Sequence, residues 1–244
     1  MEAFSDFTFG SGDENIGERS KRFKGETGRA YRVSFVWFDS YNEDGTPSEG
    51  AKLKFTQCER IYKDNVGYIA VTAANRAAMS KLTGEQPKQQ IATVICVWPC
   101  DKDGELDVSS FKNGKGWMVQ PWIFSPMKFK TIGQNNRRFP LTKHDLSMLC
   151  SDGQYQKMTF TPEGESLLLK YLGSKNEEIR AVASKIVSDA RAVAEGIHSE
   201  LARNMTVDEV REKLGGEKLG GEKSSPTGGH TDKNVDSMLD GIDL

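Results

Sequence analysis

Short runs of alternating hydrophobic and polar residues fill the first two thirds of the chain. Runs of this kind, rich in β-branched and aromatic residues, predict β-strands. They are separated by turn-forming stretches such as NEDGTPSEG, DKDGE and KNGKG. The predicted strands are YRVSFVWF (31–38), KLKFTQCERIY (52–62), GYIAVTAA (67–74), IATVICVWP (91–99), GWMVQPWIF (116–124) and QYQKMTFTP (154–162). Residues 75–84 predict a short helix that crosses one end of these strands.

Short strands without regularly alternating helices predict a mainly β fold. We expect a small barrel or sandwich of the oligonucleotide-binding (OB) class, because α/β folds would alternate strands with long helices. Such a domain is large enough to bury a proper hydrophobic core within the 244 residues of the chain.

The hydrophobic period changes after Gly173 from two residues to that of an α-helix. One apolar stripe recurs about every 3.7 residues and comprises Ile179, Val182, Ile186, Ala190, Val193, Ile197 and Leu201. Ser174 with Glu177, and Thr206 with Glu209, have the spacing of capping boxes and predict two helix starts. The stripe either packs on the β-domain or forms a self-association seam between two copies, and the sequence leaves both open.

A glycine-rich stretch separates the helical segment from the C-terminus. The repeat LGGEK at 214–218 and 219–223, followed by SSPTGG, is typical of a flexible linker. The predicted organisation is an acidic N-terminal arm (1–18), an OB-like nucleic-acid-binding domain (19–172), a helical segment (173–214), a flexible linker (215–231) and a disordered, acidic protein-docking tail (232–244).

Charge is distributed unevenly along the chain. Residues 19–143 contain 21 Lys+Arg and 12 Asp+Glu, whereas residues 1–18 contain five acidic residues and no basic one. A basic centre between acidic ends favours a polyanionic partner, although the formal net charge of the whole chain is only −2.

No apolar run is long enough for a membrane span, and the N-terminus lacks the pattern of a signal peptide. We therefore expect a cytoplasmic protein.

The sequence contains no familiar catalytic motif. It lacks a P-loop, a G-x-S-x-G elbow, an H-E-x-x-H helix and a dinucleotide-binding fingerprint. We therefore expect a binding protein rather than an enzyme, without a cofactor. Cys96, Cys100, Cys150 and His144 have tolerable spacing for zinc, but buried free cysteines explain the same pattern. We expect no metal, while zinc binding by these four residues stays an open alternative.

Basic and aromatic residues recur together in RSKRFKGETGRAYR (19–32), KLKF, ERIYK and SPMKFKTIGQNNRRF (125–139). Single-stranded nucleic acid needs these two components: cations that follow the phosphates, and flat side chains on which bases stack. In KLKF and MKFK, strand alternation predicts lysines on one face and apolar groups on the other. The candidate binding residues are Arg22, Lys24, Arg32, Lys52, Lys54, Arg60, Tyr62, Lys63, Trp122, Lys128, Phe129, Lys130, Arg137, Arg138 and Phe139.

This layout resembles the single-stranded-DNA-binding proteins of bacteria and, especially, of tailed bacteriophages. The resemblance rests on the linker 215–231, on the terminal DSMLDGIDL, and on LCSDGQYQKMTFTPEGESLLLK, which is similar to the closing strand of such phage domains. It implies an OB barrel that binds and protects single-stranded DNA without strong sequence preference in DNA replication, recombination and repair. If phage-encoded, the protein would act in the host cytoplasm.

The resemblance also implies that the acidic C-terminal tip recruits replication or repair proteins. The expected partner-binding residues are Asp236, Leu239, Asp240, Ile242, Asp243 and Leu244. The tip departs from the family in ending Ile-Asp-Leu instead of in phenylalanine and in having fewer acidic residues. The zinc motif of one phage subgroup is missing, so no metal is implied here.

Two other functions fit parts of the sequence. The first is an RNA-binding OB protein, because stacking and phosphate contacts do not exclude RNA. The second is a replication or transcription accessory protein that docks on a clamp or polymerase through its tail. Val235, Met238, Leu239 and Ile242 have the i, i+3, i+4, i+7 spacing of an amphipathic docking helix.

Overall fold

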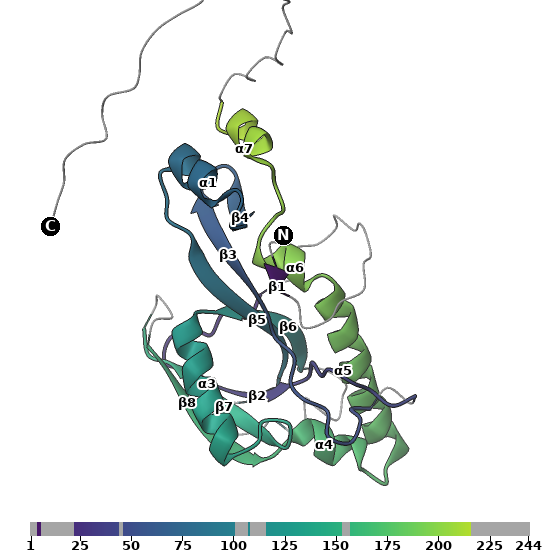
Figure 1. Cartoon of the computed structure of the whole chain (residues 1–244). Coiled ribbons are helices and arrows are strands. Elements are labelled where there is room, and N and C mark those ends of the chain that lie inside the picture. Colours follow the sequence, from purple (N-terminus) through teal and green to yellow (C-terminus); the bar gives the residue numbers. More distant parts are fainter. Residues whose placement is uncertain are drawn as a thin grey trace, which may run out of the picture.

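The computed structural model describes residues 22–43, 46–100, 107, 116–152 and 157–215, and the backbone of residues 4 and 5. An antiparallel sheet forms the centre, so the prediction of a mainly β fold is confirmed (Figure 1). The strands are β1 (Phe4–Ser5), β2 (Ala30–Phe35), β3 (Thr56–Lys63), β4 (Gly67–Val71), β5 (Lys88–Val97), β6 (Met118–Phe124), β7 (His144–Cys150) and β8 (Met158–Glu165). The helices are α1 (Arg76–Thr83), α3 (Pro126–Arg138), α4 (Leu167–Leu172), α5 (Glu177–Glu195), α6 (Ile197–Leu201) and α7 (Val207–Lys213).

Strand β5 organises the sheet. The strand order is β1-β3-β5-β2-β7-β8, with β4 added to β3 and β6 added to β5. The first half of β5 pairs with β3 and its last residues pair with β2, while β6 runs along the segment Ile91–Val97. A strand of 10 residues is long enough to pair with two neighbours in succession, which joins the β3–β4 hairpin to the rest of the sheet.

The sheet does not close into a barrel. Its strand order is an open path, and within the described residues no pairing joins β8 to β4 or β6. Helix α3 contacts β8 and β5, buries Ile132, and donates a hydrogen bond from Asn135 Nδ2 to Phe160 O (3.5 Å). The predicted closed barrel is therefore corrected to an open sheet, in which α3 covers part of the apolar core through Ile132 and no further strand pairing closes the sheet among the described residues.

The two faces of the sheet pack against different partners. Ala92, Val94 and Cys96 of β5 face helices α4 to α6, whereas Ile91 and Ile95 face a second core shared with β6, β7 and α3. This division follows the period of two along a strand. Because both faces are covered, β5 is an almost continuous run of buried apolar residues, as its sequence suggested.

The predicted apolar stripe of the helical segment packs on the sheet. Ile186, Ala190, Ile197 and Leu201 are buried in the core that includes Val94, which is the simpler of the two interpretations of the stripe. A homo-oligomer formed through residues 174–203 stays a prediction and would have to use the other side of these helices. The single predicted helix is divided at Gly196 into α5 and α6.

The two predicted helix starts differ in outcome. Thr206 and Glu209 form the expected capping box at the start of α7. Helix α5 begins instead with Asn176 as its N-cap, whose side chain accepts hydrogen bonds from the backbone of Glu178 and Ile179. An asparagine oxygen satisfies these free N–H groups as well as a serine does, so the cap moves two residues beyond Ser174.

A third core lies at the end of the β3–β4 hairpin. Ile61 and Ile69 from the hairpin, Met79 from α1 and Val210 from α7 are buried together. Figure 1 shows α1 and α7 at this end of the molecule. The chain between α6 and α7 runs along β4, with Ala70 N donating to Arg203 O and Arg203 N donating to Tyr68 O (both 2.9 Å). The helical segment 173–214 and the β-domain thus share cores.

Several predicted strand assignments are corrected at their ends. Strands β2, β3, β4, β5, β6 and β8 all overlap predicted runs, α1 matches the predicted helix, and β7 lies outside every predicted run. The segment KLKF (52–55) precedes β3, and MKFK (127–130) lies within α3. The proposed alternation of lysines and apolar groups on strand faces is therefore wrong in both segments.

No helix among the described residues is long and apolar enough to cross a membrane.

Candidate nucleic-acid interface

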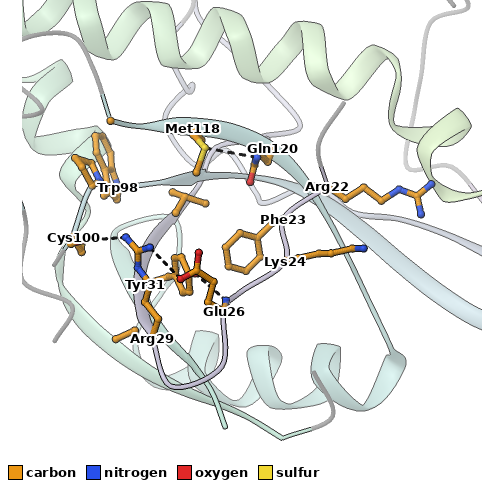
Figure 2. A pocket seen from close by; sticks show the side chains of 14 residues that line it. Arg22, Phe23, Lys24, Glu26, Arg29, Tyr31, Trp98, Cys100, Met118 and Gln120 are labelled. Atoms are coloured by element: carbon orange, nitrogen blue, oxygen red, sulfur yellow. Dashed lines mark hydrogen bonds and ion pairs between the residues drawn. The ribbon is translucent and has the colours of Figure 1, made fainter. Parts of the chain in front are cut away.

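Residues 22–25, called the strap below, cross the sheet beside strand β6. Phe23 N donates to Pro121 O (3.0 Å), and the Phe23 ring packs edge-on against Tyr31 and Trp122 at centroid distances of 5.2 and 6.4 Å. Figure 2 shows Phe23 pointing to one side of the strap and Arg22 and Lys24 to the other. This alternation is that of an extended chain. The buried phenylalanine thereby anchors the backbone from which the two cations project.

The two cations of the strap line a hollow of about 180 Å³, called the basic hollow below. The residues that line it are Arg22, Phe23, Lys24, Gly25, Arg60, Tyr68, Trp122, Ile123, Lys128 and Met158. Four of them are cationic and none is acidic. Like charges gathered at a concave surface create a positive potential that favours an anionic ligand.

Arg60 forms the floor of the basic hollow. Its guanidinium lies 3.8 Å from the centroid of the Tyr68 ring, and its Nη1 donates to Leu201 O at 2.7 Å. Burial lowers the pKa of Arg60, and the positive charge of Arg22 lowers it further, although Tyr68 acts in the opposite direction. A guanidinium nevertheless stays protonated in a protein. The hollow therefore contains a buried positive charge whose charged form an approaching anion would stabilise.

Tyr68 and Tyr62 form an aromatic surface next to this floor. They are paired directly across the β3–β4 hairpin, with ring centroids 5.0 Å apart and planes inclined by 55°. Tyr62 is 54% exposed, so its ring is accessible to a ligand. Arg22 lies 5.5 Å from the Tyr68 centroid. Exposed rings next to cations are the elements on which unpaired bases stack while the phosphates are neutralised.

Helix α3 contributes the fourth cation and a further aromatic side chain. Lys128 lines the basic hollow, and its partial burial lowers its pKa. Phe129, the next residue, is 38% exposed and packs against Phe55 and Phe124 at centroid distances of 5.0 and 6.5 Å. Phe129 and Phe55 also line an apolar pocket of about 350 Å³ next to Lys52. Lys128 and Phe129, although adjacent in the chain, thus line different hollows.

A second pocket lies on the other side of the strap. It has a volume of about 220 Å³ and shares Arg22, Phe23 and Lys24 with the basic hollow. Figure 2 shows Glu26 and Arg29 within it, with Arg29 Nη1 3.4 Å from the Glu26 carboxylate. Because a carboxylate and a guanidinium offset each other here, this pocket is less favourable to an anion than the basic hollow is.

Arg32 is placed away from the basic hollow in a buried polar cluster. Its Nε donates to Asp145 Oδ2 at 3.0 Å, and the backbone N–H of Leu167 donates to the same oxygen at 3.1 Å. Ser34 Oγ donates to the other carboxylate oxygen and accepts a hydrogen bond from Trp98 Nε1. Burial raises the pKa of Asp145. This cluster joins β2, β7, α4 and the residue directly after β5, so the structure gives Arg32 a stabilising position.

The structure therefore brings together only part of the predicted set. Arg22, Lys24, Arg60, Trp122 and Lys128 line the basic hollow, and Tyr62 extends it through Tyr68. The remaining predicted residues lie elsewhere: Lys63 donates to Thr83 O, Lys54 lies over Trp37, Lys52 and Phe129 line the apolar pocket, and Lys130, Arg137, Arg138 and Phe139 lie exposed along or just after α3.

Sequence reasoning missed two residues of this region. Tyr68 faces Tyr62 across the hairpin, and the turn-forming YKDNVGY could have indicated that pairing. Glu200 lies in α6, and its Oε2 accepts a hydrogen bond from Arg22 Nε at 2.9 Å. Nothing in the sequence could have paired two residues that are 178 positions apart.

The remaining candidate residues give no second site. Among the described residues, no three His, Cys, Asp or Glu side chains are grouped so that they could hold a metal ion. Cys96 and Cys150 are buried free thiols. The predicted partner-binding residues Asp236, Leu239, Asp240, Ile242, Asp243 and Leu244 lie outside the described residues, as do the linker beyond Gly215 and most of the N-terminal arm.

Comparison of the chain with protein-family models, with curated proteins and with solved structures found no match in any of the three.

Proposed function

We propose that the protein binds single-stranded DNA across the basic hollow and the neighbouring Tyr62–Tyr68 surface. The observation that supports this proposal is the convergence of Arg22, Lys24, Arg60 and Lys128, from three separate parts of the chain, beside accessible aromatic rings. Cations that follow phosphates and rings on which bases stack are the two requirements for binding single strands without sequence preference.

The form of the site favours single strands over duplex DNA. Stacking on the Tyr62–Tyr68 surface requires unpaired bases, whereas reading a duplex requires a helix or ribbon that enters a groove. We therefore propose a role in protecting single strands during replication, recombination and repair, without catalysis. The acidic tail would recruit replication proteins.

Titration with labelled oligo-dT, oligo-rU and a duplex of equal length tests this proposal. We expect oligo-dT to bind most tightly and the duplex most weakly. If about four to six phosphates are neutralised, the logarithm of the association constant should fall with the logarithm of salt concentration with a slope of about −3 to −4. A flat salt response or equal affinity for the duplex would contradict the proposal, and tighter binding of oligo-rU would identify RNA as the ligand.

A further inference from the structure

Glu200 places a negative charge directly against the basic hollow. Its carboxylate pairs with Arg22 through Nε at 2.9 Å, and the two side chains are 21% and 30% exposed. A guanidinium that is already paired is less available to a phosphate than a free one. A single strand that binds across the hollow therefore meets Arg22 with its charge partly neutralised.

The backbone of α6 is fixed, so Glu200 cannot leave with its helix. Leu201 O accepts a hydrogen bond from Arg60, and His198 Nε2 lies 3.3 Å from Thr56 Oγ1 in β3. Arg203 then joins the edge of β4. These contacts on both sides of Glu200 hold its Cα in place, and its side chain alone can turn away from Arg22.

We propose that Glu200 is a positioning residue that competes with DNA phosphate for Arg22, so that binding exchanges a carboxylate for a phosphate. This inference rests on the proposed function of the hollow. In the free protein the ion pair orders the long Arg22 side chain across the hollow next to Tyr68. Upon binding, a phosphate replaces the carboxylate, because Arg22 contacts Glu200 through Nε, whereas a phosphate can take two parallel hydrogen bonds from the same guanidinium. Glu200 thereby lowers affinity while it keeps Arg22 oriented.

A double-mutant cycle with Glu200→Gln and Arg22→Gln tests the exchange. The probe is fluorescein-labelled oligo-dT at low salt, and the matched control is Glu195→Gln, which removes an exposed carboxylate at the end of α5. We expect E200Q to raise affinity about three- to tenfold and E195Q to change it less than about twofold. In the R22Q background, E200Q should have no more effect than E195Q, because the guanidinium for which Glu200 and phosphate compete is absent.

Two further measurements separate exchange from a merely structural role. In wild type, DNA binding would free the Glu200 carboxylate, which then takes up a cation from solution and reduces the net release of cations. E200Q lacks this carboxylate, so the salt dependence of its affinity should be steeper than that of wild type. Glu200→Asp should restore affinity toward that of wild type. Thermal melting verifies that each variant is folded.

Three results would overturn the proposal. An equal gain from E200Q with and without Arg22 would show a general charge effect. A loss of affinity in folded E200Q would show that Glu200 prepares Arg22 for phosphate without competing for it. If wild type binds oligo-dT but the cycle shows no coupling between the two residues, this inference alone fails. If wild type does not bind oligo-dT at all, the proposed function fails and this inference fails with it.

Discussion

Arg60 stacks on Tyr68, with its guanidinium 3.8 Å from the centroid of the tyrosine ring. Arg22 approaches the same ring at 5.5 Å, so two cations lie near one aromatic ring. Besides burial, the positive charge of Arg22 lowers the pKa of Arg60, and an anion near both groups would relieve this repulsion. The arrangement therefore favours an anion in the hollow, and under the proposed function the accessible ring of Tyr62 would lie near the phosphates of the strand.

We expect Tyr62→Ala to weaken oligo-dT binding by about 1–3 kcal/mol, the range for losing one stacked base. Stability should change little, since the side chain is 54% exposed. Tyr62→Phe keeps the ring and should bind like wild type in anisotropy titrations. Phe139→Ala, which removes another exposed ring beyond the end of α3, is the matched control. A larger loss from F139A than from Y62A would move the stacking surface to α3.

Lys128 should contribute more to binding than the other cations of α3. Because Lys128 lines the basic hollow, K128Q should reduce the steepness of the salt slope by about 0.7, which corresponds to one phosphate contact. R137Q and R138Q, at the exposed end of the helix, should leave the slope nearly unchanged. Changing Lys128, Lys130, Arg137 and Arg138 together should weaken binding to all sequences. If R137Q alone matches K128Q, the strand follows the outer face of α3 instead.

Asp145→Asn should destabilise the fold by about 2–4 kcal/mol, because an amide NH2 replaces one of the two oxygens that accept hydrogen bonds from Ser34, Arg32 and Leu167. Urea denaturation at pH 7 measures this loss. Arg76→Gln, which breaks an exposed pair with Glu59, should cost less than about 1 kcal/mol. Similar losses for the two variants would show that burial does not strengthen the Asp145 pair.

The contribution of Asp145 should also depend on pH. Burial raises its pKa above the ordinary value of 3.8, so the folded state holds this proton more tightly than the unfolded state does. Stability from this group is therefore greatest below pH 3.8 and decreases as the pH rises through the raised pKa. The difference in unfolding free energy between wild type and D145N should shrink over that window. A difference that grows instead would show that hydrogen bonds and Arg32 dominate the titration.

Truncation after Gly229 should leave thermal stability nearly unchanged, because the removed segment is short, mostly polar and follows a glycine-rich linker. Affinity for oligo-dT should rise, most at low salt, since four aspartates that compete for cations are removed. Replication proteins captured by the full chain should be lost, and a peptide of residues 232–244 should compete for them. The same peptide with Ile242 and Leu244 changed to alanine should not. Unfolding upon truncation would show that the tail is structural.

Local patterns predicted local structure well in this chain. The capping box of Thr206 and Glu209 is confirmed, and the strand runs around Val33 and Val94 are also present in the structure. The strand alternation predicted for MKFK (127–130) was wrong because the alternating basic and aromatic residues were given more weight than Pro126 after Ser125. Proline in the first turn, after an N-cap serine, favours a helix start.

Long-range partners decided which cations belong to the candidate site. Arg32 and Arg22 have similar sequence surroundings, yet Arg32 pairs with Asp145 inside the protein while Arg22 lies at the basic hollow. The carboxylates that they contact are 113 and 178 residues away. A single sequence gives no measure of such distant pairings. The predicted binding residues therefore included both cations paired inside the protein, such as Arg32, and cations at the basic hollow, such as Arg22.

The pairing of Arg203 with strand β4 determines how far the chain can be shortened. A fragment ending at residue 172, the predicted boundary of the β-domain, would leave the backbone of Tyr68 and Ala70 without these hydrogen bonds. An unprotected strand edge recruits strands from other molecules and causes aggregation. The same fragment would lack Leu201, whose carbonyl orients Arg60. The smallest well-behaved unit for expression and crystallisation should therefore extend through α7, whose Val210 is buried in the third core.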